Sequence, residues 1–167
     1  SLETPSAEGI YTTATVGVLT GVEGYKMYLP NGVYYFYAIS NNSSTASAKF
    51  VNERSEPLNN GVDYLWASNK LQDVTSTQVS MPILFQHCAT QIAFNISAGS
   101  GIKLDKLVSA SITPANPGAT MDMITGEITP STTYSTETAN MGINGFTAQY
   151  IMLPLKTNTA MPLTLQI

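Results

Sequence analysis

His87 and Cys88 are neighbours in the chain, and they are its only histidine and its only cysteine. A cysteine can act as a thiol nucleophile when a histidine serves as its base. The two residues lie in the segment VSMPILFQHCATQIAFNI, residues 79–96, which is otherwise rich in apolar side chains. They therefore mark either an active site or a stretch of protein core that happens to contain both residue types.

The apolar residues around this pair indicate that the chain changes course there. They occupy odd positions before the pair and even positions after it: Val79, Met81, Ile83 and Phe85, then Ile92, Phe94 and Ile96. A strand that keeps its period of two cannot bury both sets on one face. A bulge, a turn or a passage between sheets must therefore lie within residues 86–91.

Adjacent positions are a poor geometry for a cysteine–histidine nucleophile. Neighbouring side chains point to opposite faces of a strand, or diverge by about 100° in a helical turn. We therefore expect His87 to cap or bond the backbone at the bend and Cys88 to be a small buried filler. One histidine and one cysteine also cannot supply a closed zinc site.

Other catalytic signals are weak. The chain has no G-x-G-x-x-G, P-loop, H-E-x-x-H or G-x-S-x-G motif. Two glycosidase carboxylates could come from the acidic residues, but such residues in strand-and-turn proteins are usually solvated surface; the candidates are Asp63, Asp73, Asp105, Asp122 and Glu127. The sequence predicts no catalytic, cofactor-binding or metal-binding residue and no enzyme.

Composition narrows the class of protein further. The 167 residues suit one ordinary domain or two small ones, and 43% of them are hydrophobic while only 11% are charged. The net charge is −4 with no cluster of Lys or Arg, which argues against nucleic acid as a partner. A single cysteine excludes an internal disulfide framework. No apolar run approaches the ~20 residues of a membrane helix.

Short alternating runs separated by turn residues predict strands and no helix. We expect a strand in 10–19 and a hairpin in 25–40 around Pro30-Asn31-Gly32, whose second strand is apolar on both faces and hence central in its sheet. Extended structure resumes at 62–68, residues 121–129 form a hairpin with Thr125-Gly126 at its turn, and 131–145 is a polar connection. The last two strands fall in 146–155 and 162–167. Regular short strands of this kind favour a β-sandwich.

Three pieces, YYFYAIS (34–40), VDYLWAS (62–68) and the segment 79–96, together resemble the fimbrillin-like proteins of the Bacteroidetes, the subunits of type V pili and related adhesins. Asp63, Leu65 and Ala67 match an Asp-x-Leu-x-Ala pattern, and Phe85 and His87 match Phe-x-His. The resemblance covers roughly residues 25–98. These are structural signatures, and the resemblance carries no catalytic role for His87.

The resemblance implies an all-β fold, a transthyretin-like β-sandwich with Greek-key type connections. It implies a lipoprotein precursor exported to the cell surface, and a structural or adhesive subunit of outer-membrane-associated fimbriae. Its partners would be other fimbrial subunits, joined by strand addition after proteolytic removal of an early strand, and a host protein or glycan. We expect residues 1–167 to form one domain, which is either the whole subunit or the N-terminal domain of a longer protein.

Two alternatives stay open. Residues 161–167 could donate a strand to a neighbouring subunit, because Leu163, Leu165 and Ile167 alternate as a donor strand must, or they form an ordinary strand of their own sandwich. The competing function is a carbohydrate-binding β-sandwich module with flat rings for sugars, although the same rings suit a core; they are Tyr34, Tyr35, Tyr37 and Trp66.

Overall fold

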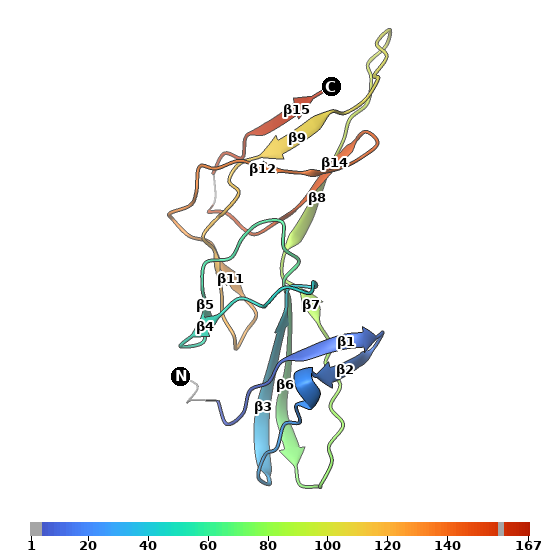
Figure 1. The fold of residues 1–167 in the computed structure, drawn as a ribbon. Helices are drawn as coiled ribbons and strands as arrows, with labels where there is room; N and C mark the ends of the chain where they lie inside the picture. The colour runs from blue at the N-terminus through green and yellow to red at the C-terminus, as the bar shows by residue number, and fades with distance from the viewer. Residues whose placement is uncertain (1–4, 157–158) are drawn as a thin grey trace. The chain divides into compact units, whose positions relative to one another are not determined.

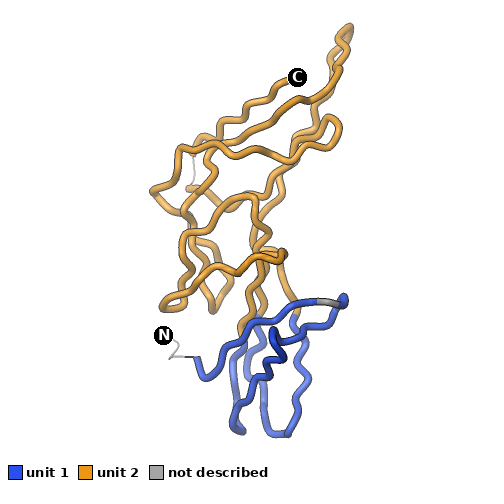
Figure 2. Tube along the Cα trace, in the orientation of Figure 1, with its two compact units in different colours: residues 1–36, 68–83 blue, residues 37–67, 84–167 orange. Residues whose placement is uncertain are grey.

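The computed structural model describes residues 5–156 and 159–167. In that part of the chain every element is a short strand except one 3-10 turn, so the all-β prediction is confirmed. The chain divides into two compact units, coloured separately in Figure 2: unit 1 comprises Ser1–Phe36 and Ser68–Ile83, and unit 2 comprises Tyr37–Ala67 and Leu84–Ile167. The transthyretin-like topology and the single-domain organisation stay predictions.

Unit 1 begins with a hairpin where the sequence predicts one strand. Strand β1 (Tyr11–Thr15) pairs antiparallel with β2 (Val18–Gly21), and the 3-10 turn η1 (Val22–Gly24) follows. Gly17 lies at the turn with φ +81°, a conformation that glycine adopts without strain. The break at Val16-Gly17 therefore divides the expected strand of residues 10–19 into two.

Unit 1 contains no buried side chain among its described residues. Its large apolar side chains are exposed instead, and they are concentrated in the hairpin and in the segment that follows it: Ile10, Val16, Val18, Leu19, Val22, Tyr28, Val33 and Tyr35. Burial of apolar surface makes the largest favourable contribution to the stability of a fold. Unit 1 therefore has little hydrophobic stabilisation of its own.

Strands β3 (Gly32–Ser40) and β6 (Leu65–Val74) form a sheet with β7 (Gln86–His87) in the order β3-β6-β7, shown in Figure 1. Strand β3 is thus an edge strand of the described sheet, and the prediction that it is central is wrong. The expected hairpin in 25–40 is also wrong, because residues 25–31 form no strand. In this segment the carbonyl of Pro30 accepts a hydrogen bond from the Tyr34 hydroxyl at 2.9 Å. Two apolar faces on β3 suggested a central strand, but Val33 and Tyr35 on one of them are exposed.

Unit 2 holds a sandwich of two three-stranded sheets. One has the order β12-β9-β15 (Ala139–Asn140, Ser109–Ile112, Leu163–Gln166), and the other has the order β13-β14-β8 (Gly142–Asn144, Thr147–Met152, Thr90–Asn95). Alternate residues of both sheets meet in the first core cluster, which buries Leu107, Ala110, Ile112, Met141, Ala148 and Met152. The predicted last two strands are confirmed as β14 and β15.

The chain passes from one sheet of this sandwich to the other at a single residue. Met141 lies between β12 and β13, is 6% exposed, and donates its backbone N–H to the carbonyl of Ala110 at 2.9 Å. The predicted polar connection 131–145 therefore contains two strands, β12 and β13. A two- or three-residue strand carries too little alternation to be visible among the Thr and Ser residues around it.

A second core cluster lies beside the sandwich in unit 2. It buries Leu58, Tyr64, Ala119, Met121 and Leu153. The short hairpins β4–β5 (Phe50–Val51, Arg54–Ser55) and β10–β11 (Thr120–Met121, Ile128–Thr129) contribute to it, and the second of these confirms the hairpin predicted in 121–129. Gly126 has φ +72°, and a Cβ there would lie 2.5 Å from the indole of Trp66, so only glycine fits this turn.

Asn60 joins three segments in unit 2. Its side chain is buried, with Nδ2 donating to the carbonyl of Pro114 at 3.0 Å and Oδ1 accepting from the N–H of Leu153 at 2.8 Å. The backbone N–H of Asn60 also bonds the carbonyl of Ala115 at 3.3 Å. A buried amide with both ends paired fixes the relative positions of the groups that it bonds.

Replacing Asn60 by alanine should destabilise the protein strongly. The buried N–H of Leu153 and the carbonyl of Pro114 would both lose their partner, and we expect a loss of about 3 kcal/mol in the free energy of unfolding. Urea denaturation measures this loss. Asn59→Ala is the matched control, because the Asn59 side chain is exposed and should change stability by less than about 0.5 kcal/mol. Equal effects of the two substitutions would contradict the role of Asn60.

Candidate functional site

His87 and Cys88 lie where the chain leaves one sheet for another. Strand β7 ends at His87, which is paired with Leu65 of β6, and the N–H of Cys88 bonds the carbonyl of Tyr64 at 2.8 Å. Strand β8 then begins at Thr90. The change of course predicted within 86–91 is therefore confirmed. The alternation of residues 79–85 suggests a strand, but these residues form none. Their side chains still alternate between half-buried and exposed, as Phe85 and Leu84 do.

Asp63 is the centre of the polar contacts around this bend. Its Oδ1 lies 2.7 Å from Nδ1 of His87, and its Oδ2 accepts a hydrogen bond from Nδ2 of Asn42 at 2.9 Å. The His87 side chain is 67% exposed and that of Asp63 only 20%. His87 thus bonds a carboxylate, and the expectation that it bonds the backbone is wrong.

The environment keeps Asp63 ionised. Burial by itself would raise its pKa, but the hydrogen bonds from His87 and Asn42, with the charge of His87, together hold the pKa of this carboxyl below its ordinary value. A carboxylate that is favoured in its charged form contributes to folding stability.

Cys88 is a packing residue. Its side chain is half-buried against the second core cluster. Burial raises the pKa of its thiol, the negative charge of Asp63 raises it further, and a backbone hydrogen bond from Trp66 offsets only part of this. The thiolate is the nucleophilic form of cysteine, so a raised pKa argues against a nucleophile here.

The residues of the two sequence motifs meet around β6 and β7. Leu65 and His87 are register partners, Asp63 bonds His87, and Ala67 is 3% exposed in the sheet. Phe85 is half-buried immediately before β7. The motifs therefore coincide with a structural junction in unit 2, and their functional weight stays a prediction.

Asn42 is a partner of this junction that the sequence analysis missed. It belongs to the polar loop 41–47, where Nδ2 of Asn41 donates to Oγ1 of Thr45 at 2.7 Å and to the carbonyl of Ala46 at 2.9 Å. The backbone of Asn42 has φ +48°. Asparagine tolerates that conformation better than most residues. The only sign of this role in the sequence is the presence of asparagine in a loop rich in Asn and Ser.

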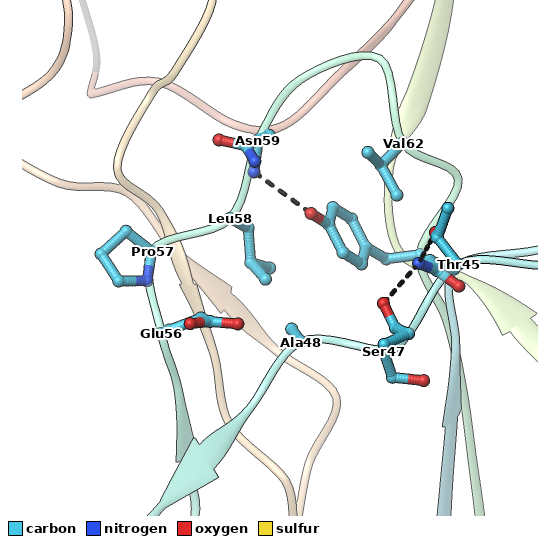
Figure 3. A pocket seen from close by; sticks show the side chains of 11 residues that line it. Thr45, Ser47, Ala48, Glu56, Pro57, Leu58, Asn59 and Val62 are labelled. Atoms are coloured by element: carbon cyan, nitrogen blue, oxygen red, sulfur yellow. Dashed lines mark hydrogen bonds between the residues drawn. The ribbon is translucent and has the colours of Figure 1, made fainter.

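Two open pockets flank the polar loop. The larger, of about 370 Å³, lies between the loop and the segment Glu56–Asn59, and Figure 3 shows Leu58 and Val62 projecting into this region. The smaller, of about 270 Å³, is lined by Asp63 and Ile151 among others. Asn41 and Thr45 line both pockets.

Asp122, another of the acidic candidates, has partners that give it a structural role. Asp122 caps the turn of the β10–β11 hairpin, where its Oδ1 accepts bonds from the N–H groups of Ile124 and Thr125, and its Oδ2 lies 4.0 Å from Nη2 of Arg54. Burial would raise the pKa of Asp122, but these bonds and the Arg54 charge lower it below its ordinary value. No group of three or more His, Cys, Asp or Glu side chains suited to a metal ion occurs among the described residues.

The aromatic rings considered for sugar binding differ in their surroundings. Trp66 donates Nε1–H to the carbonyl of Met123 at 2.8 Å, and Gly126 lies against its indole. Tyr34 is partly buried and bonds Pro30, Tyr37 is partly buried, and Tyr35 is 51% exposed. The indole of Trp66 is therefore partly covered, which leaves less of its face for a sugar.

The candidate donor segment is paired within its own chain. Strand β15 (Leu163–Gln166) runs antiparallel to β9, and Leu163 and Leu165 pack against the first core cluster. Ile167 is 58% exposed beyond the strand. Donation of this segment to another subunit stays a prediction, and it requires β15 to leave β9.

No helix in the described part of the chain is long and apolar enough to span a membrane.

Removing the charge of Asp63 should give a pH-dependent loss of stability. Asp63→Asn removes the carboxylate that pairs with Nδ1 of His87 and Nδ2 of Asn42, and we expect a cost of about 1 kcal/mol at pH 7 in urea denaturation. Because the folded pKa is lowered, this contribution is complete above about pH 4, the ordinary carboxyl value in the unfolded chain. It should then decline as the pH falls through the folded pKa of Asp63, so the two proteins converge in acid. A difference that stayed constant to pH 2 would show that the charge is irrelevant.

Cys88 should react slowly with thiol reagents in the native protein. Its thiol is half-buried and its pKa is raised, so alkylation by iodoacetamide at pH 7 should be many-fold slower than in the urea-unfolded chain. Mass spectrometry measures the rate. His87→Gln should leave the native rate nearly unchanged. Rapid native alkylation that is suppressed by His87→Gln would instead reveal an activated thiolate.

Comparison with known proteins agrees with the fold. In the crystal structure of a candidate cell adhesion protein from Bacteroides uniformis, the matching region superposes with a TM-score of 0.68 at 24% sequence identity. The match covers 93% of this chain and 64% of that protein, so this chain spans about two thirds of its length. No curated protein sequence gives a significant match.

The sequence itself matches a family over nearly its whole length. The family model described as fimbrillin-like aligns with residues 4–167, which include both the β6–β7 junction around Asp63 and the sandwich of unit 2. This range extends well beyond the residues 25–98 that carry the recognisable motifs. The chain therefore belongs to the fimbrillin-like family.

Proposed function

We propose that this chain is a structural and adhesive subunit of bacterial surface fimbriae, exported as a lipoprotein precursor and held at the outer membrane in the fimbrium. The observation that carries the proposal is membership of the fimbrillin-like family over residues 4–167. The neighbouring fold of a candidate cell adhesion protein agrees with it. The environment of Cys88 and Asp63 supports a role without catalysis.

Assembly by strand addition is the mechanism that the features of unit 1 support best. Strand β3 is an edge strand of its described sheet, and Val33 and Tyr35 on it are 59% and 51% exposed. An unpaired edge can accept an added strand, which gains main-chain hydrogen bonds and buries alternate side chains. When donor and acceptor surfaces differ, the contact is heterologous, and it builds an open filament where the rotation between copies does not close a ring.

Strand β1 fits the early strand whose removal would precede assembly. In the described structure β1 pairs with β2 alone, and no side chain of unit 1 is buried. Its loss would therefore cost little packing within unit 1. The donor would be a strand from a neighbouring copy, with residues 161–167 as the candidate segment.

Charges on the exposed edge should prevent assembly without unfolding the protein. Lysine on an edge strand opposes pairing with another strand, so Val33→Lys with Tyr35→Lys should abolish filaments that electron microscopy detects for the unsubstituted chain. The free energy of unfolding should change by less than about 0.5 kcal/mol per site, because both side chains are exposed.

Val51→Lys is the matched control for this experiment. Val51 is 72% exposed on strand β4 of unit 2, so the substitution adds the same charge away from the proposed edge. Filaments of normal length from the Val33 and Tyr35 variant would refute strand addition at β3. Loss of filaments in the Val51 variant as well would point to a general effect of charge.

A further inference from the structure

The larger pocket beside the polar loop has a mainly polar accessible lining with a smaller apolar part. Leu58 and Tyr64 line it from the second core cluster and are 2% and 5% exposed. Asn41, Ser47 and Glu56 line it as well, and Figure 3 shows Glu56 and Ser47 at different places around Leu58. Its volume of about 370 Å³ lies within the range of small-molecule sites.

Two polar side chains of the lining are held in place through one atom and leave another atom available. Nδ2 of Asn41 is used within the loop by Thr45 and Ala46, and its Oδ1 accepts no bond from the described residues. Oε1 of Glu56 accepts the N–H of Lys49 at 2.9 Å, and Oε2 has no such partner there. Holding a side chain in advance lowers the entropy cost of binding a ligand.

The backbone around the pocket is held as well. The phenol oxygen of Tyr64 accepts the N–H of Asn59 at 3.2 Å, which fixes the segment that carries Leu58, and Figure 3 marks this bond. The N–H of Leu58 bonds the carbonyl of Ala119 at 2.8 Å. The pocket is therefore bounded by a fixed loop on one side and a fixed segment on the other.

The free atoms define the chemistry of the ligand. Two fixed acceptors, Asn41 Oδ1 and Glu56 Oε2, need O–H or N–H donors, and the Ser47 hydroxyl can donate or accept. Beneath them, Leu58 and Tyr64 offer apolar contact to C–H groups. A small ring that carries hydroxyl groups at its edge and C–H groups on its face meets both requirements.

Other ligand classes fit less well. An anion would meet the carboxylate of Glu56, no Lys or Arg lines the pocket, and the chain has a net charge of −4. A divalent cation needs several oxygen ligands, and Glu56 is the one carboxylate in the lining. A purely apolar group would leave the fixed acceptors without partners and lose affinity.

We propose that this pocket binds one neutral sugar residue of a glycan, with Glu56 and Asn41 accepting hydrogen bonds from its hydroxyl groups and Leu58 and Tyr64 contacting its C–H face. This site differs from the aromatic rings that the sequence suggested for a sugar. The inference does not rest on strand addition, because binding is measured on the monomer and assembly is measured on filaments.

The test is a titration of the ¹⁵N-labelled monomer with glucose, galactose, mannose and N-acetylglucosamine, each alone, followed by NMR chemical shifts. At least one neutral sugar should give saturable shifts of the amides of Ser47, Glu56 and Leu58, and N-acetylneuraminic acid should give none because its carboxylate meets Glu56. Ser47→Ala should weaken binding about fivefold, the value of one hydrogen bond. Glu56→Gln should weaken it about tenfold or more, because Gln can keep the bond to Lys49 but presents a donor in place of the second oxygen.

Two matched variants serve as controls. Ser44 lies in the same loop and lines neither pocket, and Glu127 is an exposed carboxylate on another hairpin. Ser44→Ala and Glu127→Gln should leave the affinity unchanged. The proposal is overturned if no neutral sugar shifts these amides up to about 50 mM, a concentration beyond the weakest useful affinities. Preferential binding of the acidic sugar, or affinities that Ser47→Ala and Glu56→Gln do not alter, would overturn it equally.

Discussion

The buried amide of Asn60 is the interaction on which the arrangement of unit 2 depends. The first core cluster draws on Met152 and the second on Leu153, and Asn60 bonds the backbone of Leu153 at the point where the two clusters adjoin along the chain. Its other end bonds Pro114, just beyond strand β9. Apolar packing is non-directional, so it brings these segments together without fixing their register. A satisfied buried amide supplies that specificity, because it fixes the positions of the groups that it bonds.

Polar groups in unit 2 act mainly as restraints on turns and bends. Asp63 restrains the bend at His87, Asp122 restrains the β10–β11 turn, and Asn41 restrains the polar loop. Such residues have the chemical types of catalytic groups, and the difference appears only in their partners. The lowered pKa of Asp63 and the raised pKa of Cys88 both follow from a structural setting, which accounts for each of them without a substrate.

Sequence patterns predicted the strands whose alternation is long enough to detect. Strands β8, β14 and β15 and the β10–β11 hairpin were predicted because their apolar residues face a core on one side or flank a turn glycine. The bend at Cys88 was visible in the shift from odd to even positions. Strands β12 and β13 are too short for their alternation to be detected. Strand β3 has apolar residues on both faces, which predicts a central strand, but Val33 and Tyr35 on one face are exposed. The Asp63–His87 contact joins residues 24 apart in sequence, so local periodicity could not reveal it.

The passage between sheets at Met141 limits how this protein can vary in length. With one residue between β12 and β13, there is no loop to absorb an insertion. One added residue would shift the register of β13 against β14 and turn its side chains to the opposite face, or would displace the buried Met141 from the core. The connection between β8 and β9 has no such restriction over residues 97–103, which are exposed. Insertions and deletions in related chains should therefore occur in that loop and not at Met141. Related chains would then differ in the loop at one end of the sandwich, while the connection between its two sheets stays the same.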